Sequence, residues 1–350
     1  MRSFLTIGCA LFLSLVQGGH PRAVSKAAAS AFPKLPVFEG HAIALTSEQS
    51  AALARGEPVV QMLAPKDDRV VAAFGIIAIK TTRKAFTTGL TNFPQSLRAQ
   101  GIENFGLFKT PATSANVSTF AINSSDATAL KKCHLGKCEF KLPASEMARA
   151  KTMLDGGADG PAKLAAYGRG KVVEYVTGYR ARGNAAMVVY DDFGKGGVRA
   201  SEAFAALLAA SPYLKENAPA VEQYLLQYPR GRPGDASDAI YWSEETLKGL
   251  RPTVTVNHIV VSSPSGSSGM TVAVTKQLYS DHYFEGMLDE RFVVDRRDAP
   301  GGAGVYLILL RQYRFDNLPG GVLNIRGRAK SAMQERMVAE LKRTQSVAAH

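Results

Sequence analysis

The stretches TVTVNHIVVS (residues 253–262), MTVAVTKQLYSDHYF (270–284) and VYLILLRQYRF (305–315) decide the fold class of this chain. Each is rich in β-branched and aromatic residues, and glycine- or proline-containing turns separate them, which is typical of consecutive antiparallel strands. A shorter strand is expected at 290–295. The segment 322–342 that follows has apolar residues at helical spacing, so it predicts a long C-terminal helix with one buried face. Its stripe is Ile325, Ala329, Ala332, Met333 and Met337.

The first part of the chain predicts strands mixed with short helices. The apolar, β-branched run 69–79 predicts a strand, a helix is expected over 81–90, and short strands are expected at 105–109 and 117–122. The stretch 124–245 instead predicts mainly helices, and a Gly- and Pro-containing boundary loop lies near its end. The predicted helices are 143–154, 161–182, 200–210 and 220–228, and the loop is 229–238.

These elements predict an α+β fold, in which an antiparallel sheet packs on a long C-terminal helix and a large helical insertion occupies the middle of the chain. The expected parts are an N-terminal α+β region over 32–123, the insertion over 124–245, and the completing strands and helix over 246–350.

The order of elements resembles the helix-grip arrangement of the START/polyketide-cyclase superfamily. The matching parts are 69–97 and 253–342, roughly half of the chain. The resemblance implies a curved antiparallel sheet that wraps the last helix, an apolar cavity between the two, and a lipid-like ligand. The helical stretch 124–245 has no place in the minimal arrangement and would be an insertion.

Residues 1–31 have the order of parts of a secretory signal peptide. Met1 and Arg2 give a short positive start, Phe4 to Val16 is almost entirely apolar, and small residues follow from Ala23 to Ala31. The apolar run is short for a membrane-spanning helix, which needs about 20 residues. We therefore expect an exported protein, periplasmic or secreted; an uncleaved N-terminal anchor is the alternative.

Two cysteines, Cys133 and Cys138, lie in the segment KCHLGKC (132–138). In an oxidising compartment such a close pair favours a local disulfide, with Gly136 at the turn. The alternatives are two free thiols, or a metal site that adds His134. Structural zinc normally takes four ligands, and no second cysteine pair exists, so the disulfide is expected.

The formal net charge of +12 favours anionic neighbours, among them an anionic membrane surface. The lysines and arginines are scattered and interleaved with acids, and no aromatic–basic stripe marks a nucleic-acid groove. A nucleic-acid partner is therefore not expected. No cofactor is expected either, because metal, nucleotide and flavin motifs are lacking.

No catalytic residue is assigned from the sequence. Ser280, Asp281 and His282 include the residue types of a catalytic triad, but neighbours on a strand point to opposite faces. We expect these three residues to be structural.

The candidate ligand-binding residues are polar groups on apolar strand faces: His258, Lys276 and Arg311. A buried charge is costly unless it is paired or meets a polar ligand. If the strands curve round the last helix, these groups would give an apolar cavity a cationic spot that suits an anionic amphiphile such as a fatty acid. The alternative is that they pair with acids of the protein, for example Asp281 or Asp316.

The sequence thus predicts an exported, non-enzymatic protein that binds an apolar or amphiphilic small molecule. The alternatives are an exported enzyme on an α+β scaffold, and an envelope interaction or scaffold protein without a cavity.

Overall fold

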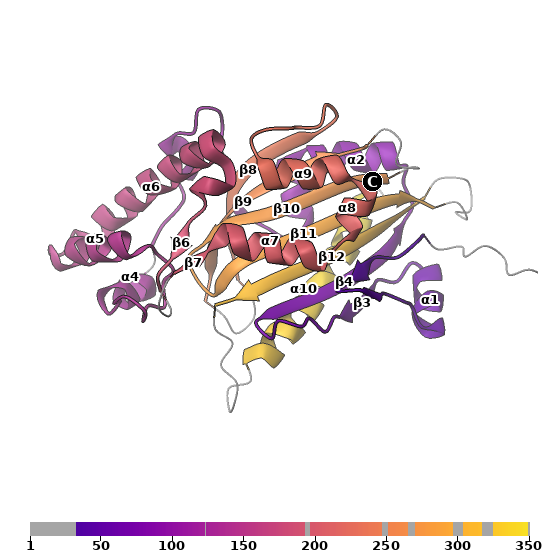
Figure 1. The fold of residues 1–350 in the computed structure, drawn as a ribbon, viewed down its shortest axis with the longest axis horizontal. Helices are drawn as coiled ribbons and strands as arrows, with labels where there is room; N and C mark the ends of the chain where they lie inside the picture. Colours follow the sequence, from indigo (N-terminus) through magenta and orange to yellow (C-terminus); the bar gives the residue numbers. More distant parts are fainter. Residues whose placement is uncertain are drawn as a thin grey trace, which may run out of the picture. The chain divides into compact units, whose positions relative to one another are not determined.

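An eight-stranded antiparallel sheet forms the centre of the fold, as the computed structural model shows (Figure 1). The structure describes residues 33–122, 124–192, 197–246, 251–264, 270–296, 304–316 and 325–348. The signal peptide predicted for residues 1–31 lies outside this part of the chain. Within the described part, no helix has the length and apolar character needed to cross a membrane.

The strand order across the sheet is β3-β4-β12-β11-β10-β9-β8-β5. The bounds are β3 Val59–Met62, β4 Val70–Ile79, β5 Asn104–Leu107, β8 Ser237–Glu245, β9 Thr253–Ser262, β10 Met270–Ser280, β11 Phe284–Asp295 and β12 Val305–Phe315. The predicted strands 253–262 and 305–315 are confirmed to the residue. Strands β8 to β12 form a meander of sequential neighbours, which the turn residues between the apolar runs had indicated.

Three sequence-based assignments were wrong in detail. The predicted strand 270–284 is the whole of β10, a turn, and the first residue of β11, with Tyr283 at φ 57° in the turn. The region around Trp242 lies in the stretch 124–245 that was expected to be mainly helical, but it forms strand β8, whose serines and acids give it a polar composition. The strand expected at 117–122 is not formed: a short 3₁₀ helix, Ser114–Val117, ends at its first residue, and residues 118–122 form neither helix nor strand.

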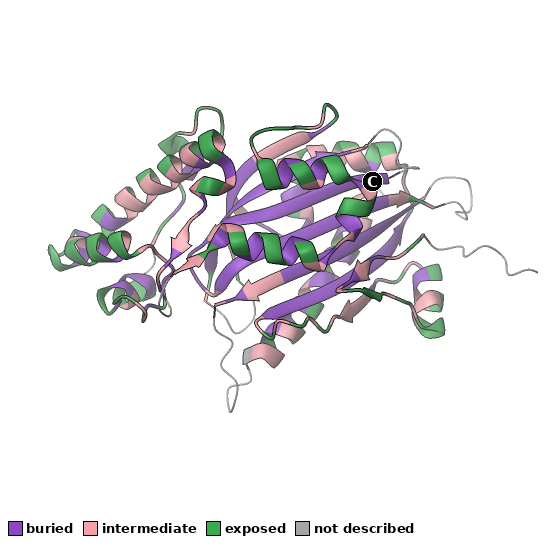
Figure 2. Cartoon of the chain, in the orientation of Figure 1, coloured by how far each residue is buried: buried purple, intermediate pink, exposed green. Residues whose placement is uncertain are grey.

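Helices cover both faces of the sheet (Figures 1 and 2). One face packs against the helices of the middle region, and the other against two short helices and the C-terminal helix α10. The first set is α6 Gly160–Arg182, α7 Ala200–Ala210, α8 Tyr213–Asn217 and α9 Pro219–Gln227; the second is α2 Arg83–Thr91, α3 Phe93–Ala99 and α10 Ile325–Ala348. The α+β fold with a helical middle region is therefore confirmed.

Smaller elements complete the described chain. They are β1 Val37–Phe38, β2 His41–Ala42, α1 Ser47–Ala54, α4 Ser124–Lys131, α5 Ala144–Asp155, the 3₁₀ turn Gly183–Ala186, β6 Val189–Tyr190 and β7 Val198–Arg199. Helices α4 and α5 pack on one another and on α6, and they share a small apolar core of their own. This group of helices forms one wall of the site described below.

Helix α10 packs on β4 through the apolar stripe that the sequence predicted. Met333, Met337 and Leu341 are buried at the contact. Gly75 of β4 allows the close approach, because a Cβ atom there would lie 2.8 Å from the Met337 sulfur. The large antiparallel sheet and the long C-terminal helix are thus packed together, as expected.

Candidate ligand-binding site

The structure separates the three residues predicted to bind a ligand. His258 and Lys276 are register partners on β9 and β10, on the face covered by the middle helices. Arg311 of β12 lies on the opposite face, against α10. The three therefore do not surround one cavity, and the grouping predicted from the sequence is corrected. Whether any of them contacts a ligand stays a prediction.

His258 is buried among the side chains of several tyrosines. Tyr179 shares a hydrogen bond of 3.0 Å with its Nδ1, and its Nε2 lies 3.2 Å from the Asp238 carboxylate. The rings of Tyr224 and Tyr228 contact it edge-on. Burial lowers the pKa of His258 to about 4, more than the neighbouring Asp238 can offset.

Lys276 is buried beside His258 and bonds to two oxygens of the helical layer. Its Nζ donates to the Asn184 Oδ1 at 2.8 Å and to the Leu225 carbonyl at 2.9 Å. Burial lowers the pKa of its ammonium group well below the usual value. The polar end of this side chain thus ties the helices to the sheet.

Arg311 belongs to a buried ionic cluster with Asp289, Arg291 and Glu340. It donates to Asp289, and its Nη1 lies 2.9 Å from the Glu340 Oε2; Arg291 contacts Glu340 at 2.7 Å. Burial alone would raise the pKa of the Glu340 carboxyl, but Arg311 and Arg291 lower it to about 2. The acids that neutralise Arg311 thus come from the protein itself, on β11 and α10.

The interface between the sheet and α10 offers little room where the helix-grip resemblance places a ligand. Two spaces beside Arg311 have volumes of about 10 and 20 Å³, enough for about one water molecule each. A hollow of about 220 Å³ lies near the end of α10, bordered by α2 and α3. It is smaller than the roughly 300–1,000 Å³ of usual ligand pockets.

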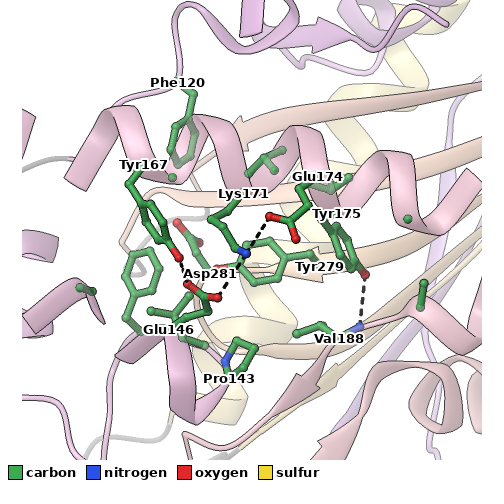
Figure 3. A pocket seen from close by; sticks show the side chains of 18 of the residues that line it. Phe120, Pro143, Glu146, Tyr167, Lys171, Glu174, Tyr175, Val188, Tyr279 and Asp281 are labelled. Carbon is green, nitrogen blue, oxygen red and sulfur yellow. Dashed lines mark hydrogen bonds and ion pairs between the residues drawn. The ribbon is translucent and has the colours of Figure 1, made fainter. Parts of the chain in front are cut away.

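A pocket of about 610 Å³ lies on the other face, between the group α4, α5 and α6 and the sheet (Figure 3). Most of its lining is apolar or aromatic. The wall from the helices and nearby loops includes Phe120, Ile122, Leu130, Phe140, Leu142, Leu164 and Val172, and the sheet adds Val256 and Tyr279. Its volume and lining are those of a small-molecule pocket.

Small residues of helix α6 line part of this pocket, beside larger ones such as Tyr167 and Tyr175. Gly168, Gly178 and Ala181 all line the pocket. A Cβ atom on Gly168 would already lie 3.2 Å from the ring of Phe120. The sequence carried this signal, since small residues interrupt the apolar and aromatic face of a long helix.

Charged and phenolic groups gather along one part of the pocket, around Glu146 of α5 (Figure 3). The Tyr167 hydroxyl donates to Glu146 at 2.6 Å, and the Lys171 ammonium lies 3.4 Å from the same carboxylate. Lys171 also donates to Glu174 at 2.8 Å, and this bond raises the pKa of Lys171. These side chains are partly exposed, so a polar ligand group could exchange hydrogen bonds with them.

Asp281 lies in the pocket lining at the β10–β11 turn. Its Oδ1 accepts a hydrogen bond of 2.8 Å from the backbone N–H of Val254. Burial raises the pKa of this carboxyl to about 7. The group can therefore offer a ligand either a hydrogen-bond donor or a negative charge near neutral pH.

The neighbours of Asp281 make their hydrogen bonds within the protein. The Ser280 hydroxyl donates to the His282 carbonyl at 2.7 Å. The His282 ring lies 2.7 Å from the Glu139 carbonyl and 3.3 Å from Asp126. Ser280, Asp281 and His282 therefore do not form a nucleophile–base relay.

No protein-family model and no curated protein matches this chain.

The predicted disulfide between Cys133 and Cys138 is present, with the two Cα atoms 4.5 Å apart. Gly136 adopts φ 76° at the turn, as expected for a glycine between the two cysteines. The bond removes both thiols from any metal site with His134. It closes a hairpin that joins α4 to the segment 139–143, and both flanks of the hairpin contribute to the pocket lining.

Sequence reasoning missed the polar residues of the pocket: Glu146, Tyr167, Lys171 and Asp281. Tyr167 and Lys171 are four residues apart and therefore share a face of α6. That spacing was visible in the sequence, but it does not show which face of the helix borders a pocket. Nothing local links these two residues to Asp281, which lies more than a hundred positions later in the chain.

Proposed function

We propose that this protein binds an apolar or amphiphilic small molecule in the pocket between α6 and the sheet. The observation that carries the proposal is a pocket of about 610 Å³ with a largely apolar lining and one polar region. The ligand class agrees with the one implied by the helix-grip resemblance, but the proposed site lies on the opposite face of the sheet from α10. Export of the protein remains part of the proposal, on the basis of residues 1–31.

The apolar walls would supply most of the binding free energy, at about 25 cal/mol for each Å² of apolar surface removed from water. The cluster of Glu146, Tyr167 and Lys171 would orient the ligand. Since Glu146 already faces Lys171, the cluster suits a polar or zwitterionic group more than a second carboxylate.

A pair of glycine variants on α6 tests the site. Gly168 lines the pocket, whereas Gly170 is exposed, and a Cβ atom there meets no atom within 4 Å. Gly168→Leu should place its side chain in the pocket and weaken binding of a neutral fluorescent probe, N-phenyl-1-naphthylamine, by at least about tenfold. Gly170→Leu should bind the probe like the wild type. Fluorescence titration measures both.

The pair is matched in helix propensity, because both variants replace a helical glycine by leucine and gain up to about 1 kcal/mol of helix stability. Far-ultraviolet circular dichroism of both variants checks that the fold is kept. Equal probe affinity in Gly168→Leu and Gly170→Leu would place the binding elsewhere, and absence of probe binding by the wild type would refute the proposal.

A further inference from the structure

The disulfide-closed hairpin carries an unusual surface. We call residues 131–138 the basic hairpin. Leu135 at its tip is 69% exposed, the highest value among the large exposed apolar side chains of the described residues. Lys131, Lys132 and Lys137 are all exposed around it. Within the described part of the chain, none of these three lysines has an acidic partner within ion-pair distance.

The basic hairpin holds Leu135 outward by a fixed framework. The Cys133–Cys138 disulfide closes its base, and His134 pairs with Lys137 across it. The Gly136 N–H donates to the Asp191 carbonyl at 3.0 Å, and the Cys138 N–H to the Asp192 carbonyl at 3.2 Å. The disulfide and these backbone hydrogen bonds therefore fix the turn in which Leu135 is exposed.

The anchor of the hairpin lies just after it. Lys141 is buried, donates to Asp192 at 2.8 Å, and contacts Asp316 at 3.2 Å. It also lies over the Tyr190 ring. These contacts fix the C-terminal flank of the hairpin to the sheet.

The acids close to the hairpin face other groups than its three exposed lysines. Glu139, the nearest exposed acid in the sequence, lies 2.9 Å from Arg251. Asp126 is buried and faces His282 and Arg251, Asp192 and Asp316 both face Lys141, and the Asp191 carboxylate accepts from the Ala144 N–H. The three exposed lysines thus have no ion-pair partner among these acids and are available to an anionic partner.

We propose that the basic hairpin docks on an anionic membrane surface, with Leu135 inserted at the interface and the lysines on lipid headgroups. Charge complementarity selects an anionic partner, and each basic residue close to such a surface contributes about 1 kcal/mol. The exposed leucine selects a lipid surface over a soluble polyanion, which offers no apolar phase for it. Binding through one short hairpin is weak and reversible.

The hairpin also adjoins the proposed ligand pocket. Leu130, directly before it, and Phe140 and Leu142, directly after it, all line that pocket. Docking would thus occur beside the pocket wall, although it does not depend on a ligand being bound.

Vesicle co-sedimentation tests the charge requirement. Wild-type protein should bind vesicles of phosphatidylcholine with 30% phosphatidylglycerol, and bind pure phosphatidylcholine vesicles at least about tenfold more weakly. Lys132→Gln/Lys137→Gln should weaken binding to the anionic vesicles by about thirtyfold, since two charges are removed. The control Lys84→Gln/Lys215→Gln changes the net charge equally at exposed lysines of α2 and α8 and should stay within about twofold of the wild type.

Leucine variants test the insertion. Leu135→Ser should weaken binding to the anionic vesicles by about tenfold, while Leu226→Ser, at another exposed leucine, should leave it unchanged. If the lysine variant loses binding and Leu135→Ser does not, the hairpin is a polyanion site and the membrane assignment is wrong. Equal binding to both vesicle types also overturns it. Neither assay uses the pocket, so failure here leaves the ligand proposal standing.

Discussion

Buried charged side chains connect the layers of this protein. Lys276 joins β10 to the helical layer, Lys141 joins the hairpin flank to the sheet, and Arg311 joins β12 to α10. Each is buried and each has hydrogen-bond partners from a different element. Since an unpaired buried charge is costly, these contacts require the layers to come together in one arrangement.

Arg311 should act in stability and not in the proposed pocket. Arg311→Met removes a partner of both Asp289 and Glu340, so we expect the free energy of unfolding to fall by about 3–5 kcal/mol in urea titrations. Probe binding in the pocket should stay unchanged at temperatures where the variant is folded, because Arg311 lies on the other face of the sheet.

Two further variants make this result interpretable. Arg328→Met, at an exposed arginine of α10, should change stability by less than about 0.5 kcal/mol. Adding Glu340→Gln to Arg311→Met should recover part of the loss, because it removes one uncompensated charge. A fully stable Arg311→Met with weakened probe binding would instead restore the sequence-based ligand role of Arg311.

The sequence identified these polar residues but not their sides of the sheet. Alternation along β9 placed His258 with Val256 and Val260, and alternation along β12 placed Arg311 with Leu309. Whether His258 and Arg311 lie on the same side of the sheet depends on the register between the strands. A shift of one residue in that register moves a side chain to the other side. That information lies in long-range pairing, so the grouping of the three residues could not be obtained from local pattern.

At the scale of elements, the sequence was most informative where patterns were long and apolar. The bounds of β9, β12 and α7 were predicted correctly, and those of α6 to within one residue. Strand β8 was missed because Ser237, Asp238, Ser243 and Glu244 give it a polar composition. These residues find partners on neighbouring elements, for example Asp238 with His258 and Glu244 with Asn104.

The C-terminal helix provides an element-scale prediction. Met333→Asp would bury a carboxylate against β4, and we expect the protein to lose at least about 3 kcal/mol of stability or fail to fold. Gln334→Asp introduces the same group at the next, exposed position and should change stability by less than about 1 kcal/mol. Thermal unfolding followed by circular dichroism compares them. Equal melting temperatures would mean that α10 does not pack on the sheet.

At the scale of the whole molecule, buried carboxyls should make stability depend on pH. Glu290 accepts a hydrogen bond from Ser211 under α7, and burial raises its pKa to about 8; burial likewise raises that of Asp281 to about 7. The unfolded chain loses these protons near pH 4, while the folded protein keeps them to higher pH. Stability should therefore fall as pH rises from about 4 to 8 on account of these groups.

His258 contributes in the opposite direction below its ordinary pKa. Its folded-state pKa of about 4 means that the unfolded chain gains a proton first as pH falls below about 6.5, which favours unfolding. Between about pH 6.5 and 8 the carboxyls should dominate among these three groups.

The variant Glu290→Gln isolates the contribution of Glu290 to the pH dependence of stability. Relative to the wild type, this variant should become more stable by a few kcal/mol between about pH 5 and pH 9, because its amide cannot ionise. The difference between the two profiles cancels the remaining groups. Glu103→Gln, at an exposed site, should keep the wild-type profile. A constant difference between Glu290→Gln and the wild type across this range would show that Glu290 does not titrate there.

The pairing of β4 with β12 affects how the chain folds during its synthesis. Strand β4, VVAAFGIIAI, is buried at every position, and one of its edges pairs with β3 close by in the sequence. Its other edge pairs with β12, where Ile79 meets Val305, so that partner leaves the ribosome more than 200 residues after β4. Until then a long apolar strand edge stays open to other chains. The nascent protein should consequently rely on a chaperone between the synthesis of β4 and that of β12, and the meander β8–β12 should form before β4 joins it.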